Sequence, residues 1–127
     1  MTWQDAALAT AGLIGSAVAV VHGVLVERLM VKPFLELSSA DKRFGEAVRR
    51  LVPLLLHFST LAWFLGGAAL IVAAMTFEGP ARLVTALFVG SLFLFGAAGN
   101  LWATRGRHPG WMLMAAAVAL IALGLAA

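Results

Sequence analysis

Four long apolar segments alternate with short polar stretches along the chain. They cover residues 6–26, 51–77, 83–103 and 111–127. About 20 apolar residues are enough for a helix to cross a bilayer, and only the last segment falls short of that length. Turn-forming residues separate the later segments, at 78–80 and 105–110. The pattern predicts an all-α fold, an antiparallel four-helix transmembrane bundle that forms one integral membrane domain over residues 1–127.

The polar stretch between the first two segments has a pattern of its own. Pro33 is expected to end the helix that leaves the membrane, and Ser38 or Ser39 to cap a new one. Apolar residues then recur at helical spacing up to Leu51, with basic residues between them. This predicts an amphipathic segment on the cytoplasmic surface, lying against anionic lipid headgroups.

Composition and charge support a membrane setting. Hydrophobic residues make up 62% of the 127 residues and charged residues only 12%. The net charge of +3 does not indicate nucleic-acid binding, because eight of the nine lysines and arginines lie in two loops on one predicted side. These eight are Arg28, Lys32, Lys42, Arg43, Arg49, Arg50, Arg105 and Arg107. The positive-inside rule makes that side cytoplasmic and places both termini on the other side. The expected location is therefore the plasma membrane.

Two histidines are the main chemical signal. His22 lies four residues inside the end of the first segment, and His57 six residues inside the start of the second. At about 1.5 Å of rise per residue, both lie roughly 6 to 9 Å below the cytoplasmic boundary. Asn100 adds a polar group to the same layer from the third segment. Polar groups at such depths are costly, which favours a function for them.

Three chemistries fit this layer, and the sequence leaves them open. His22 and His57 are placed to bind the iron of a b-type haem, the leading cofactor candidate, with basic residues such as Arg50 near its propionates. The same two histidines are candidate ligands of another metal ion. A proton or quinone site is the third possibility. The absence of cysteine excludes thiolate ligands and disulfides.

The leading functional hypothesis is therefore a cofactor- or ligand-binding membrane module. In the alternative, the histidines only join helices through hydrogen bonds, and the chain is an accessory subunit or a self-associating bundle. A small dimeric exporter is less favoured, since every Asp and Glu lies at or beyond a helix end. No nucleophile and base occur at a recognisable spacing, and there is no phosphate-binding loop, so the sequence gives an enzyme little support without excluding one. The expected partners are lipid and either a second copy or another membrane subunit.

Two short stretches carry a family resemblance. His22-Gly23-Val24-Leu25-Val26-Glu27-Arg28 contains an H-x-x-L-x-E pattern, and His57-Phe58-Ser59-Thr60-Leu61-Ala62-Trp63 follows a histidine with Ser, Thr and Trp. Both resemble a group of small bacterial four-span proteins of uncharacterised function, although Val26 stands where glycine is common in that group. The resemblance implies a bacterial inner-membrane protein in which His22, Glu27, Arg28 and His57 act together. It implies no activity.

Overall fold

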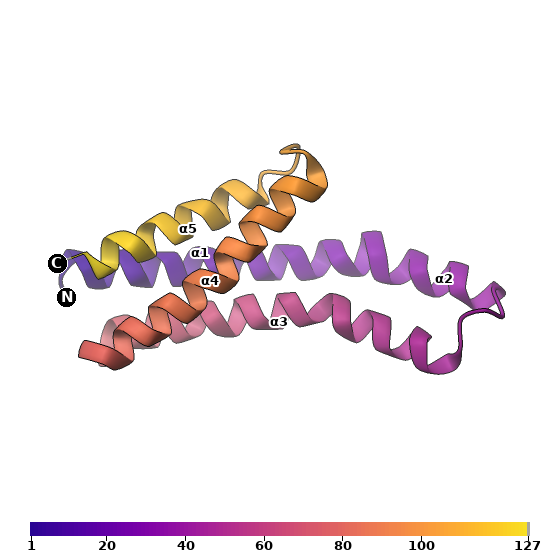
Figure 1. Cartoon of the computed structure of the whole chain (residues 1–127), viewed down its shortest axis with the longest axis horizontal. Coiled ribbons are helices and arrows are strands. Elements are labelled where there is room, and N and C mark those ends of the chain that lie inside the picture. The colour runs from indigo at the N-terminus through magenta and orange to yellow at the C-terminus, as the bar shows by residue number, and fades with distance from the viewer. Residues whose placement is uncertain (127) are drawn as a thin grey trace.

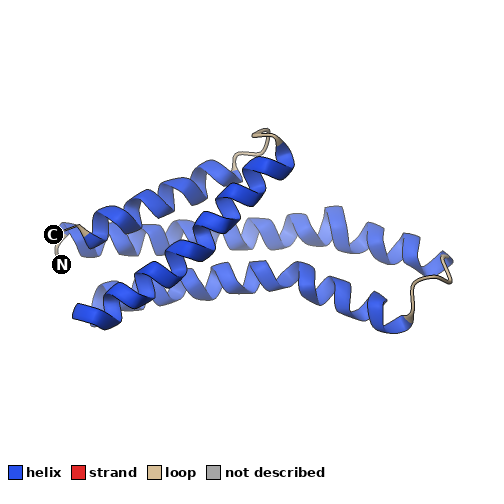
Figure 2. Cartoon of the chain, viewed as in Figure 1, coloured by secondary structure: helices blue, strands red, loops and turns tan. Residues whose placement is uncertain are grey.

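The chain is all-helical, as the hydrophobic pattern predicts. A computed structural model describes residues 1–126, and within that range every regular element is a helix (Figure 2). In chain order the elements are α1 (Trp3–Val26), η1 (Glu27–Val31), α2 (Lys32–Ala40), α3 (Glu46–Thr76), α4 (Gly79–Thr104) and α5 (Gly110–Leu125). The short element η1 is a π-helical turn that joins α1 to α2 without a break. The described residues thus form four rods, and three of them are long and apolar enough to cross a membrane.

The first rod differs from its prediction. It begins at the Thr2 cap, whose hydroxyl accepts the Asp5 N–H at 3.2 Å, and continues to Ala40. Pro33 was expected to end it, and Ser38 or Ser39 to cap a new helix, but all three lie inside α2. The wider turn of η1 precedes the proline, which therefore occupies the first turn of α2, where a residue without an N–H is tolerated.

The chain reverses at residues 41–45, not at the proline. The Arg43 guanidinium donates to Asp41 at 2.7 Å and holds the pKa of that carboxyl below its usual value. Gly45 then precedes α3 as its N-terminal cap residue. The predicted amphipathic segment is consequently divided. Its first half continues α1 as α2, and its second half is the beginning of α3.

The rods pack as two neighbouring pairs. α1 contacts α3 most extensively and also contacts α5, while α4 contacts both α3 and α5 (Figure 1). Figure 1 shows α3 returning beside α1, α4 diverging from the end of α3 at an angle, and α5 returning along α1. α2 and the first part of α3 extend beyond the loop that joins α4 to α5, and we call residues 27–56 the two-helix arm. Both termini lie at the opposite end of the molecule.

Small residues permit the close contact between α1 and α3. A methyl group added at Gly12 would lie 2.5 Å from the Gly67 carbonyl oxygen, and one added at Gly67 would lie 2.3 Å from the Ser16 hydroxyl. Phe93 of α4 is fully buried, and the far end of its ring packs against Gly15 of α1. These contacts build a core of mainly Ala, Leu, Val and Phe side chains between the rods.

The outer surface is also apolar. Large hydrophobic side chains are exposed along all four rods, among them Leu13, Val20, Leu54, Leu55, Phe58, Phe64, Val84, Phe88, Phe95, Trp102 and Leu113. Three rods are long and apolar enough to cross a membrane: Trp3–Ala40, Glu46–Thr76 and Gly79–Thr104. α5 is apolar throughout but shorter, with 16 residues.

Candidate functional site

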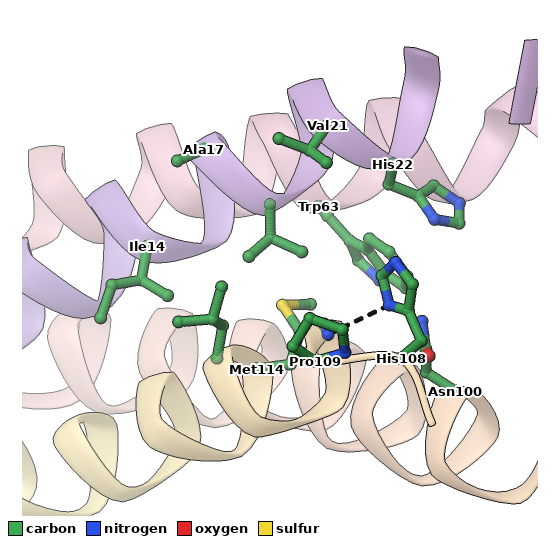
Figure 3. Close-up of a pocket in the computed structure, with 12 residues that line it drawn as sticks. Ile14, Ala17, Val21, His22, Trp63, Asn100, His108, Pro109 and Met114 are labelled. Carbon is green, nitrogen blue, oxygen red and sulfur yellow. Dashed lines mark hydrogen bonds between the residues drawn. The ribbon is translucent and has the colours of Figure 1, made fainter. Parts of the chain in front are cut away.

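A pocket of about 290 Å³ lies between α1 and the beginning of α5. Its walls are mostly aliphatic, and its polar groups gather at the end nearest the loop between α4 and α5 (Figure 3). Those polar side chains are His22 from α1, Asn100 from α4 and His108 from the loop. Ala17, Val21 and Leu113 line the pocket and are themselves exposed, so it opens on the outside of the bundle.

His22 stands beside Trp63 at this polar end. Their ring centroids are 4.5 Å apart, with the planes tilted by 52°. The His22 Nε2 atom lies 3.1 Å from the Ser59 hydroxyl of α3, which turns that side of the ring away from the pocket. Figure 3 shows the His108 imidazole in front of the Trp63 indole, with the His22 side chain beside them.

His108 is held by the backbone at the start of α5. Its Nδ1 atom accepts the Gly110 N–H at 3.1 Å, which fixes the ring over the pocket. The loop itself is held by Trp111, whose indole N–H donates to the Gly106 carbonyl at 3.3 Å. Asn100 lines the pocket, and its Oδ1 atom is buried without a hydrogen-bond partner. Unpaired buried acceptors are uncommon in native proteins, so this one is a sign of a specialised region.

His57 has a different environment. Its Nε2 atom lies 3.0 Å from a carboxylate oxygen of Glu27 on η1, and both side chains are partly exposed. His57 is not among the residues that line the pocket. The two histidines expected to act on one ligand are on neighbouring helices, but each has its own hydrogen-bond partner.

The structure brings together two of the residues predicted in the polar layer. Asn100 does reach the His22 region, since both side chains line the same pocket. Arg50, expected near the propionates of a haem, instead forms an exposed ion pair with Glu46 one turn earlier on α3. Among residues 1–126, no three His, Cys, Asp or Glu side chains are grouped as a metal-binding set.

Trp63 and His108 line the polar end of the pocket, and neither was proposed as a site residue from the sequence. In the sequence, Trp63 is one of many apolar residues of the second segment. Whether it faces the pocket depends on how α3 is rotated about its own axis, which the sequence does not indicate. His108 lies in a loop, where the hydrophobic pattern gives no orientation. The sequence nevertheless contains one indication of its orientation. His108 lies two residues before Gly110, the first residue of α5, and a histidine at that position can accept a free N–H of the helix.

Comparison of the chain with protein-family models, with curated proteins and with solved structures found no match in any of the three.

Proposed function

We propose that the chain is a four-span antiparallel membrane bundle that binds a small lipid-soluble molecule with a polar head. The observation that carries this proposal is the pocket between α1 and α5, where three polar side chains from separate elements meet at one end of an aliphatic cavity. Such a combination of apolar walls and a few convergent polar groups is typical of small-molecule sites.

The membrane setting has two supports. The outer faces of all four rods carry exposed Leu, Val, Phe and Trp side chains, which water would disfavour and acyl chains would not. The basic residues are concentrated in 27–50 and 104–110, as expected for the cytoplasmic side of a bacterial inner membrane. This orientation puts the polar end of the pocket toward the cytoplasm and both termini outside.

The shape of the pocket supports a ligand that enters from lipid. The exposed lining residues Ala17, Val21 and Leu113 face the side of the bundle where lipid would lie. A molecule dissolved in the bilayer can thus enter sideways, with its head toward His22 and His108 and its apolar part along Ile14. Water-soluble ligands would have to cross this apolar mouth.

The test compares a blocked pocket with a matched control. Ala17→Phe places an aromatic ring in the mouth, whereas Val20→Phe adds a similar ring to an exposed position of the same helix outside the pocket. Protein purified in mild detergent is examined by native mass spectrometry and by lipid extraction. We expect wild type and Val20→Phe to retain a molecule of defined mass and Ala17→Phe to lose it. Equal retention by all three would contradict the proposal.

The same preparation tests the haem hypothesis. A Soret band that disappears in both His22→Ala and His57→Ala would identify haem as the ligand and both imidazoles as its axial ligands. A colourless protein that still carries a molecule sensitive to Ala17→Phe would support a ligand other than haem.

A second function is favoured by a specific observation. His22 and His57 each join the first rod to α3, through Ser59 and Glu27 respectively, as expected if they serve helix assembly alone. In that case the chain is an accessory subunit or a self-associating bundle. Light scattering of the detergent-solubilised protein would then show a stable oligomer or a bound membrane protein, with no small molecule in the pocket.

A further inference from the structure

The hydrogen bonds around His108 fix its protonation. The Nδ1 atom accepts the Gly110 N–H at 3.1 Å and therefore carries no proton. A neutral imidazole then has its proton on Nε2. Figure 3 shows the ring edge opposite Nδ1 directed toward His22 and Trp63. His108 thus offers an N–H donor at the polar end of the pocket.

The hydrogen bonds around His22 suit the opposite role. The single hydroxyl proton of Ser59 is donated to the Leu56 carbonyl at 3.3 Å. With its proton on the Leu56 carbonyl, Ser59 Oγ is an acceptor toward His22, and in that arrangement His22 Nε2 carries the proton of the 3.1 Å contact. The remaining Nδ1 atom then has a lone pair, and His22 lines the same pocket as His108. His22 thus offers an acceptor.

The two imidazoles therefore present one donor and one acceptor beside the Trp63 indole, and Asn100 Oδ1 adds a second acceptor to this end of the pocket. A ligand that satisfies both imidazoles must itself donate one proton and accept another. A carbonyl or a carboxylate has acceptors only, and a fatty acid is ionised at neutral pH because carboxyl pKa values lie near 4. A phenolic hydroxyl, with a pKa near 10, keeps its proton and has lone pairs as well.

We propose, resting on the binding function above, that the ligand carries a hydroquinone-type head whose hydroxyl donates to His22 Nδ1 and accepts from His108 Nε2–H. The planar ring fits beside the Trp63 indole, and its apolar tail follows the aliphatic walls toward Ile14. The oxidised quinone keeps the bond from His108 but places a carbonyl lone pair against that of His22. The site consequently prefers the reduced form of the molecule.

The experiment measures binding of decylubiquinol, decylubiquinone and palmitic acid to the full chain in detergent at pH 7, with oxygen excluded. Dissociation constants come from competition in native mass spectrometry. We expect decylubiquinol to bind about 10-fold more tightly than decylubiquinone, the effect of one unmatched polar group. Palmitic acid should bind more weakly than either. A quinol-to-quinone ratio near one, or tighter binding of palmitic acid, would overturn the hydroquinone assignment.

Matched variants distinguish the roles of His22 and His108. An asparagine side chain places its oxygen near the position of a histidine Nδ1, whereas glutamine reaches the position of Nε2. His22→Asn should therefore keep the preference for the quinol, and His22→Gln should lose it while keeping its contact with Ser59. His108→Asn should still accept the Gly110 N–H but weaken quinol and quinone equally, by about 10-fold. A His22→Gln variant with an unchanged ratio would contradict the assignment.

Different results would contradict the hydroquinone head and the binding function. If none of the three probes binds wild type better than it binds Ala17→Phe, and no copurifying molecule is found, the pocket is not a ligand site. If probes bind in an Ala17-dependent manner without a preference for the quinol, the binding function stands and the hydroquinone head is wrong. Circular dichroism of each variant verifies that its helices have formed.

Discussion

The contact between Gly67 and Ser16 shows how little space separates α1 from α3. A Cβ atom at residue 67 would lie 2.3 Å from the Ser16 hydroxyl and 2.5 Å from the Gly12 carbonyl oxygen. Because the second of these is backbone, the helices must separate to admit it. We expect Gly67→Ala to lower the free energy of unfolding by about 1–3 kcal/mol, measured by denaturation in mixed micelles.

Gly99 provides the matched control. It also lies within a helix, α4, and a Cβ atom there would meet nothing within 4 Å. Gly99→Ala should leave stability unchanged or raise it by up to about 1 kcal/mol, since alanine favours helix more than glycine. Similar losses for both variants would mean that helix propensity, not the close approach, determines the effect.

For individual residues, the sequence indicated which polar side chains lie within the helices better than it indicated where they point. His22 and Asn100 were predicted in one layer, and they line one pocket. His57 was predicted with them, but six residues separate it from Trp63, the pocket residue of α3. Six residues correspond to a rotation of about 240°, so these two cannot share a face. In a helix that is apolar on nearly every side, the hydrophobic pattern does not indicate which face turns inward.

The elements were predicted to within a few residues at most boundaries. The expected spans 6–26, 51–77 and 83–103 correspond to α1, to α3 without its first five residues and to α4. The span 111–127 corresponds to α5, although its last residue lies outside the described part of the chain. The exception is the region around Pro33. A proline usually signals a break, but the π-helical turn before it lets the helix continue. Such a turn depends on local packing and has no clear sequence pattern.

The two-helix arm should be the least stable part of the molecule. α2 contains only one buried residue, Ser38, and the Arg49 guanidinium of α3 donates to its carbonyl at 3.3 Å. We expect amide hydrogen exchange in 32–40 to be faster than in the buried part of α1, because few contacts oppose local opening. Arg49→Leu should accelerate it by about a further five-fold, the effect of one hydrogen bond.

Lys42→Leu is the control for that measurement. Lys42 is exposed in the loop between α2 and α3, only four residues after Ser38 in the sequence. The substitution removes a positive charge from the arm without removing the bond. If both variants accelerate exchange equally, charge rather than the Arg49 bond explains the result.

On the scale of the whole molecule, Asp5 and Arg82 join distant parts of the chain. The Arg82 guanidinium donates to the Asp5 carboxylate at 2.5 Å, and both side chains are mostly buried, at 17% and 19% exposure. Arg82→Gln and Asp5→Asn should each lower the unfolding midpoint. The double variant should lose less than the sum of the two, since the second substitution finds no partner left to remove. Strict additivity would mean that the pair is not coupled.

The proposed orientation can be tested because the chain has no cysteine. Lys42→Cys lies in the loop at the tip of the two-helix arm, and Glu78→Cys lies between α3 and α4. A thiol reagent that cannot cross membranes should label residue 78 in intact cells and residue 42 only after the membrane is opened. The reverse labelling would contradict the proposed topology.

The uninterrupted rod formed by α1, η1 and α2 has a mechanical consequence. It is about 57 Å long, whereas the hydrocarbon core of a bilayer is about 30 Å thick. A tilt of about 10° in α1 would therefore displace Ala40 by roughly 4 Å relative to the last turn of α1, over the 14 residues beyond Val26. Any movement of the helix beside His22 would be amplified at the far tip, so the rod would act as a lever that carries this movement to the end of the two-helix arm.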